Sequence, residues 1–105
     1  MAQIGRPKRL AIQTGIDTGS YSNVFAPSGT LSWEVNTIIA TQDCAIERAL
    51  DTDNDGAFDT FVEVERGPAG EFHAYKFQLD SSVGIRVKNL GTAAMTVVLL
   101  GEEIS

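Results

Sequence analysis

The sequence predicts an all-β fold, an antiparallel β-sandwich of about eight strands, most simply a jelly roll. Three observations lead to this prediction. From Arg9 onward, apolar residues recur with a period of two, and Val, Ile, Thr, Phe and Tyr make up the regular stretches. Residues typical of turns separate these stretches at short intervals. No convincing amphipathic helix lies between them, so the sheets are expected to pack on each other.

The expected strands are short. Around Trp33, apolar residues alternate with polar ones, which indicates a half-buried strand with Trp33 as its anchor. Residues 67–70 and 89–92 contain the Gly, Pro and Asn of tight turns and are predicted to be hairpin-like joints. The predicted strands are residues 10–14, 31–36, 38–41, 44–50, 61–65, 72–79, 83–88 and 95–100.

The last predicted strand, residues 95–100, is apolar on both of its faces, because Val97 points to one face whereas Val98 and Leu100 point to the other. A strand of this kind is either a central strand or an edge that another subunit covers. The second alternative would make the protein an oligomer.

Length and charge indicate one acidic domain with a basic end. The 105 residues suffice for a single core, and 43% of them are hydrophobic. The net charge of −6 argues against general attraction to nucleic acids or anionic membranes, so neither is expected as a partner. Three of the eight basic residues lie within residues 6–9. We therefore expect an extended basic arm at residues 1–9 and a single sandwich domain at residues 10–105. The candidate partner-binding residues are Arg6, Pro7, Lys8 and Arg9.

Three further features concern the compartment. The longest apolar run, residues 95–100, is far shorter than the roughly 20 residues of a membrane-spanning helix. The basic residues near the N-terminus are not followed by the apolar stretch of a secretory signal. The lone Cys44 has apolar neighbours, which indicates a buried thiol in a chain made in a reducing cytoplasm.

Residues 51–59, with the sequence DTDNDGAFD, fit the first nine positions of a calcium-binding loop. Spaced carboxylates with a Gly at the sharp turn suit a hard cation that takes six to eight oxygen ligands. The bidentate Glu that ends such a loop is missing, because Val62 stands there and Glu63 comes one residue late. The alternative is an ordinary hairpin loop rich in turn residues. The candidate Ca²⁺ ligands are Asp51, Asp53, Asp55 and Asp59.

The arm itself has two interpretations. Gly5, Arg6 and Pro7, followed by basic residues, are similar to the core of an AT-hook, which lies in the minor groove of DNA. The alternative is an arm that docks on the acidic surface of a protein partner, which the acidic remainder of the chain favours. Pro7 keeps the arm extended in both cases.

Catalytic constellations are missing from the sequence, so no enzymatic activity is expected. The single His73 lies in a strand pattern beside aromatic residues, where a packed or edge position is more usual than a general base. Cys44 has no neighbouring cation to activate it. A zinc site would need more Cys and His than the chain contains.

An acidic all-β chain with a leading arm and the stretch VGIRVKNLGTAAMTV at residues 83–97 resembles the small jelly-roll decoration, or cement, proteins of tailed bacteriophage capsids. The resemblance covers most of the chain in architecture. It implies a virion protein, made in the host cytoplasm, that binds the major capsid protein on the outer surface of the shell, often as a homotrimer, and stabilises it. Two alternatives stay open: a calcium-dependent β-sandwich binding module, and another small virion component such as a tail or neck protein.

Overall fold

The computed structural model describes residues 8–104, apart from the side chains of residues 74–76. This part of the chain contains no helix that is long and apolar enough to cross a membrane. The expected all-β fold is confirmed. The strands are β1 (Lys8–Ile16), β2 (Ser32–Ala40), β3 (Cys44–Leu50), β4 (Thr60–Gly67), β5 (Gly70–Leu79), β6 (Val83–Asn89) and β7 (Met95–Ile104).

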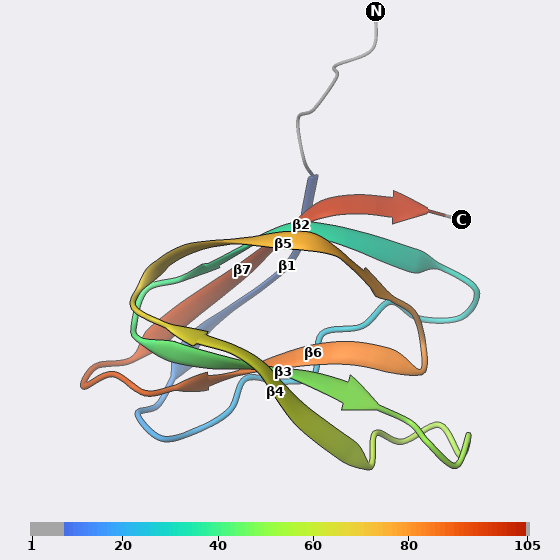
Figure 1. Ribbon diagram of the computed structural model, residues 1–105, viewed down its shortest axis with the longest axis horizontal. Helices are drawn as coiled ribbons and strands as arrows, with labels where there is room; N and C mark the ends of the chain where they lie inside the picture. The colour runs from blue at the N-terminus through green and yellow to red at the C-terminus, as the bar shows by residue number, and fades with distance from the viewer. Residues whose placement is uncertain (1–7, 105) are drawn as a thin grey trace, which may run out of the picture.

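The strands form two layers, which Figure 1 shows one above the other. Sheet A has the order β1-β7-β2-β5, and sheet B has the order β4-β3-β6. All neighbouring strands are antiparallel. The predicted antiparallel β-sandwich is therefore confirmed.

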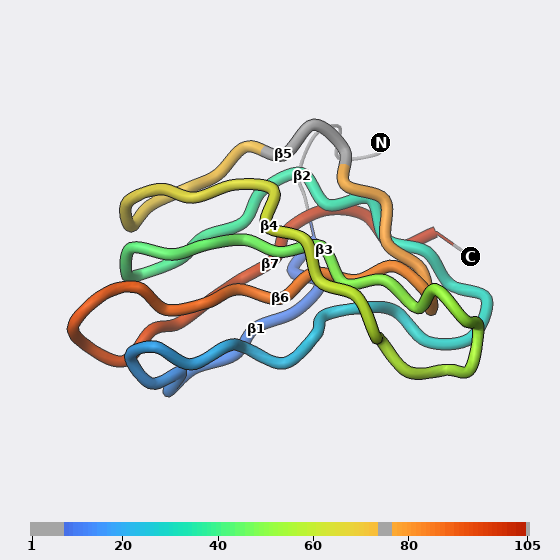
Figure 2. Tube along the Cα trace, turned by 60° about the horizontal axis from the view of Figure 1, so that its bottom comes forward, coloured from blue at the N-terminus to red at the C-terminus, as the bar shows by residue number. Residues whose placement is uncertain are grey.

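An eighth extended element lies between β1 and β2. Isolated bridges pair Tyr21 with Lys88 and Phe25 with Ile85, so residues 20–26 run beside β6 as a fourth, irregular element of sheet B (Figure 2). The backbone N–H groups of Ser22 and Phe25 both donate to carbonyls of β6 at 2.7 Å. We refer to residues 20–26 as the bridging segment. Its Gly, Ser and Asn neighbours made residues 15–23 look like a plain loop.

The eight elements pair in a nested way, like one long hairpin that has been folded over. The innermost pair is β3 with β4, followed outward by β2 with β5, the bridging segment with β6, and β1 with β7. Among the described strands, β3 and β4 are the only two that follow each other in the chain and also pair, so they form a hairpin. The turns at residues 67–70 and 89–92 lead from sheet B to sheet A, so the prediction of hairpin-like joints there was wrong.

The predicted strands 31–36 and 38–41 are one strand, β2, with a β-bulge. Val35 pairs with Gly101 of β7 and Thr37 with the next residue, Leu100, which leaves Asn36 as an extra residue against β7. The bulge places Val35 and Ile38 on the same buried face although they are three residues apart. Opposite the bulge, a side chain at Gly101 would collide with the carbonyl of Glu34.

Strand β7 lies in the middle of sheet A, between β1 and β2, so the first of the two alternatives for this strand holds. Val97 and Leu99 are fully buried in the core. Val98 and Leu100 alternate with them, lie on the outer face and are half-buried.

Strand β1 begins at Lys8, where Lys8 pairs with Gly101 and Arg9 pairs with Leu100. Two residues predicted to belong to the arm are therefore part of sheet A. Arg6 and Pro7 lie outside the described residues.

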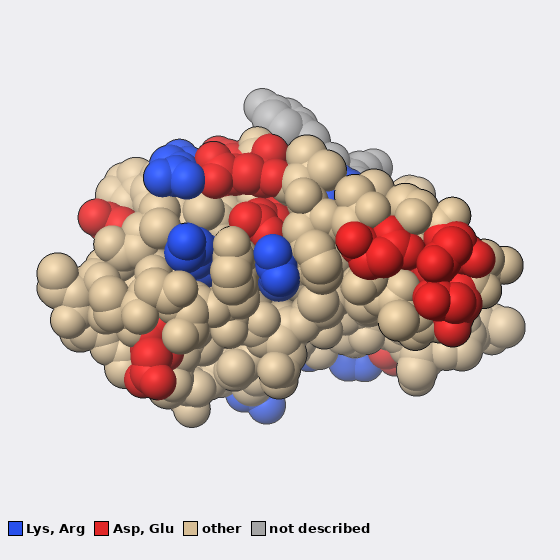
Figure 3. Space-filling view, turned by 90° about the horizontal axis from the view of Figure 1, so that it is seen from below, with Lys and Arg blue, Asp and Glu red and all other residues tan. Residues whose placement is uncertain are grey.

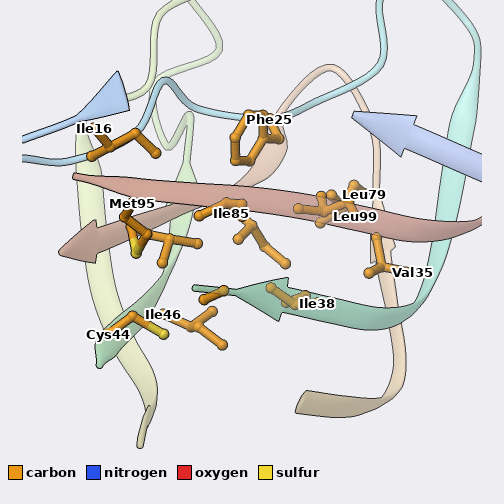
Figure 4. Packing of buried hydrophobic residues seen from close by; sticks show 13 residues of the cluster. Ile16, Phe25, Val35, Ile38, Cys44, Ile46, Leu79, Ile85, Met95 and Leu99 are labelled. Carbon is orange, nitrogen blue, oxygen red and sulfur yellow. The ribbon is translucent and has the colours of Figure 1, made fainter. Parts of the chain in front are cut away.

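The core between the sheets is mainly aliphatic, with one aromatic side chain, Phe25, and two sulfur-containing side chains, Cys44 and Met95 (Figure 4). Trp33 was predicted to anchor its half-buried strand. It is only partly buried against the core, and its Nε1–H donates to Glu103 Oε1 at 3.0 Å. Cys44 is fully buried, as predicted, and burial raises the pKa of its thiol to about 11, which keeps it protonated.

One buried polar residue, Asn89 at the end of β6, ties the two sheets together. It is fully buried, and its Nδ2 donates to the carbonyls of Ile16 at 2.9 Å and Ala93 at 2.7 Å. Its Oδ1 accepts from the N–H of Gly91 at 2.8 Å. One side chain thus joins β1, β6 and the turn into β7, with all of its hydrogen bonds satisfied.

We predict that Asn89→Ala lowers the free energy of unfolding by about 3 kcal/mol, because it leaves buried backbone groups without partners. The matched control is Asn23→Ala, at an exposed position whose side chain makes none of the observed hydrogen bonds. Urea denaturation measures both variants. A loss at Asn89 no larger than at Asn23 contradicts the linking role of this side chain.

Candidate functional site

The predicted carboxylates come together in the hairpin loop between β3 and β4, residues 51–59, which we call the acidic loop. One carboxylate oxygen from each of Asp51, Asp53, Asp55 and Asp59 lies within 4.8 Å of the others. Figure 3, which looks onto the outer face of sheet B, shows acidic side chains gathered at one end of the molecule. The sequence therefore identified a real cluster of oxygen donors.

Hydrogen bonds to the backbone organise the same loop as a turn. Asp51 accepts from the N–H of Asp55 at 3.3 Å and of Gly56 at 2.9 Å. Asp59 accepts from the hydroxyl of Thr52 at 2.6 Å and from its N–H at 3.1 Å. Asn54 and Gly56 have φ angles of 60° and 88°, which these residue types adopt most readily. The turn interpretation thus accounts for much of the composition.

The pKa values of Asp53, Asp55 and Asp59 are shifted in different directions. The hydroxyl of Thr52 is the main cause that lowers the pKa of Asp59 to about 2. The N–H of Ala57 is the main cause that lowers the pKa of Asp55. The pKa of Asp53 is raised, chiefly by the facing carboxyl of Asp55. Asp53 therefore takes up a proton more readily than Asp55 or Asp59, and a hard cation bound between the carboxylates would offset their mutual repulsion.

The two described residues of the predicted basic site lie apart from the acidic loop, at the start of β1. Lys8 Nζ is 3.5 Å from Glu103 Oε2, and both side chains are partly or largely exposed. Arg9 is exposed on the outer face of sheet A, beside Leu100.

A second cluster, which the sequence did not reveal, crosses the outer face of sheet B. The guanidinium carbon of Arg86 lies 3.7 Å from the ring centroid of Tyr21 and 3.6 Å from that of Phe61. Arg86 Nε also donates to Glu47 Oε1 at 2.8 Å. We call Tyr21, Arg86, Glu47 and Phe61 the aromatic ladder. It takes one side chain from each of the four neighbouring elements of this sheet, the bridging segment, β6, β3 and β4.

The ladder is held together by an ion pair, and its aromatic side chains are exposed. The side chains of Arg86 and Glu47 are 21% and 13% exposed, so the ion pair is largely shielded from water. The two flanking aromatic residues are 39% and 36% exposed. The alternation of Arg86 and Lys88 with buried Val87 was a signal for an outward face. The pairing of Tyr21 with this face was not predictable, because the bridging segment has no strand pattern.

The remaining candidate, His73, is exposed on β5 and pairs with Thr37 of β2. No pocket is found in the part of the chain that the structure describes.

Comparison of the chain with protein-family models and with curated proteins finds no match in either set.

We predict that Thr52→Val raises the pKa of Asp59 from about 2 toward its ordinary value of 3.8, because the variant loses the donating hydroxyl. Since the pKa of Asp59 is lowered in the folded state, the stability it contributes is complete above pH 3.8 and is lost as the pH falls through about 2. Carboxyl titrations by NMR measure the shift. Asp80, whose pKa is lowered by Ser82, is the internal control and should not change.

Proposed function

We propose that this protein is a virion structural protein that binds the outer surface of a phage capsid and stabilises the shell. The observation that carries the proposal is the aromatic ladder, a preorganised and exposed group of Tyr, Phe and Arg on the outer face of sheet B. Tyr and Arg are enriched among the residues that dominate the energy of protein interfaces. Their fixed positions lower the entropy that must be lost on binding.

The strand pairing supports the virion assignment. When the bridging segment is counted, each sheet has four elements, and the first element pairs with the last, the second with the seventh, and so on inward. This nested arrangement favours a jelly roll, the fold used by many viral capsid domains. Fold alone does not define function, so the ladder and the resemblance to decoration proteins carry the rest.

Stabilisation then follows from linkage. A protein that binds only the assembled shell stabilises it by RT ln(1 + [L]/Kd), which is about 2.7 kcal/mol per site when the free concentration is 100 times Kd. The major capsid protein is the proposed partner. No covalent chemistry is needed.

We predict that the purified protein sediments with undecorated capsids of its own phage, and that Tyr21→Ser and Phe61→Ser each weaken binding at least tenfold. The matched control is Ile104→Ser, at an exposed apolar residue of β7 that lies outside sheet B. Thermal melts verify that every variant is folded. If the wild type does not bind capsids, the proposed function fails. If the wild type binds and the two variants bind equally well, the ladder is not the contact surface.

The same assay tests the arm and the alternative virion location. Because Lys8 and Arg9 pair within sheet A, the informative truncation removes residues 2–7 and leaves β1 intact. Weaker capsid binding of this truncation supports a contact by Arg6 and Pro7. Purified tails are the second target, and binding to tails alone would assign the protein to the tail or neck.

The carboxylates of the acidic loop favour a second candidate, a calcium-dependent binding module. On this hypothesis, the thermal midpoint rises in millimolar Ca²⁺ and returns to its starting value with chelator, because Ca²⁺ binds the folded loop. Asp53→Asn with Asp55→Asn should abolish the response, while Glu63→Gln, outside the loop, should retain it. An unchanged wild-type midpoint contradicts a calcium site.

A further inference from the structure

The outer face of sheet A carries an apolar stripe that crosses three strands. Ile12 of β1 pairs with Val98 of β7, which pairs on its other side with Ile39 of β2. Leu100 lies on the same face, one row further along β7. Ile12 is 47% exposed, and the other three side chains are half-buried by their neighbours. We call these four residues the sheet A stripe.

The stripe takes no part in the core of the sandwich. The core side of the same strands is occupied by Val97, Leu99 and Ile38, which are fully buried. An antiparallel sheet with one face in water normally carries polar residues on that face. Neighbouring apolar side chains on three strands are the pattern of a face that packs against another surface.

Charges flank the stripe at opposite edges of the sheet. Arg9 lies on β1, at one edge, beside Leu100. Glu71 lies on β5, at the other edge, beside Ile39. Both side chains are exposed. Among the described side chains, the face therefore has a positive charge on one edge strand and a negative charge on the other, an arrangement that a copy turned by 180° complements.

We propose that two copies of this chain associate through the outer faces of their A sheets, about a two-fold axis that runs along the strands. In this arrangement β1 of each copy lies over β5 of the other. Val98 of each copy then packs on Ile39 of the other, and Arg9 comes within reach of the partner's Glu71, twice because the interface is isologous. The carboxylates of Glu34 and Glu102, one row beyond Leu100, remain in water at the rim.

The size of the face suits such a pair. Four strands about 4.8 Å apart, with nine or ten residues rising about 3.3 Å each, cover about 19 by 30 Å. This flat area of about 570 Å² is smaller than the roughly 800 Å² per partner that a standard stable interface buries, and side chains that project from the face add to it. The two aromatic ladders would face in opposite directions, so each pair would present one ladder to the shell; this last step rests on the proposed function.

The test uses the purified protein without capsids. Sedimentation velocity at micromolar concentration should give the mass of two copies for the wild type, and Val98→Lys should raise the dissociation constant at least a hundredfold. The matched control is Val62→Lys, because Val62 is 48% exposed on β4 of the other sheet. Thermal melts of both variants show whether they are folded.

A charge exchange makes the test specific for a second copy. Arg9→Glu and Glu71→Arg should each weaken the pair about tenfold, and the double variant should recover the wild-type constant. A monomeric wild type, a trimeric mass or no recovery in the double variant overturns the proposal. If the wild type is monomeric and Val98→Lys lowers capsid binding instead, the stripe is covered by the capsid. Since capsid binding is measured separately, either proposal can fail while the other stands.

Discussion

The hydrogen bonds of Asn89 hold the two sheets together at the end of the sandwich where β1 and β6 end and the chain turns into β7. From the last position of β6, its amide reaches the carbonyl of Ile16 in the other sheet and both sides of the turn into β7. Its own backbone bonds to Gly19 and Ser20, which lead into the bridging segment. The position of the bridging segment, and with it the ring of Tyr21 beside Arg86, thus depends on a residue whose side chain never reaches the surface. In a small β domain, one satisfied polar group in the core can specify the register of several strands.

Period-two patterning was enough to predict the sandwich and most of its strands, because one face of each strand meets the core and the other meets water. It failed where the period itself is interrupted. The bulge at Asn36 made β2 look like two strands, since an extra residue reverses the alternation. The bridging segment was missed for the opposite reason. It is held by two isolated bridges and by Phe25 in the core, with no alternating pattern of its own.

Of the two candidate sites, the one formed by residues close in sequence was predicted, and the one formed by residues far apart in sequence was not. The acidic loop was predictable, because its four carboxylates are neighbours in sequence and a hairpin keeps them together. The aromatic ladder was not, because Tyr21 and Arg86 are far apart in the chain and meet only when the nested pairing is complete. Trp33 packs against the core but is only partly buried, because its indole N–H needs a polar partner and finds Glu103 near the surface.

Strand β7 shows why an apolar run is an incomplete guide to position. A run that is apolar on both faces predicts either a central strand or a covered edge. Here β7 is central, and this position explains its paired backbone but not the apolar character of Val98 and Leu100, which lie away from the core. The neighbours Ile12 and Ile39 extend the same character across β1 and β2. A central strand in an exposed sheet needs no such residues, so their presence on three adjacent strands is best explained by a surface that meets another molecule.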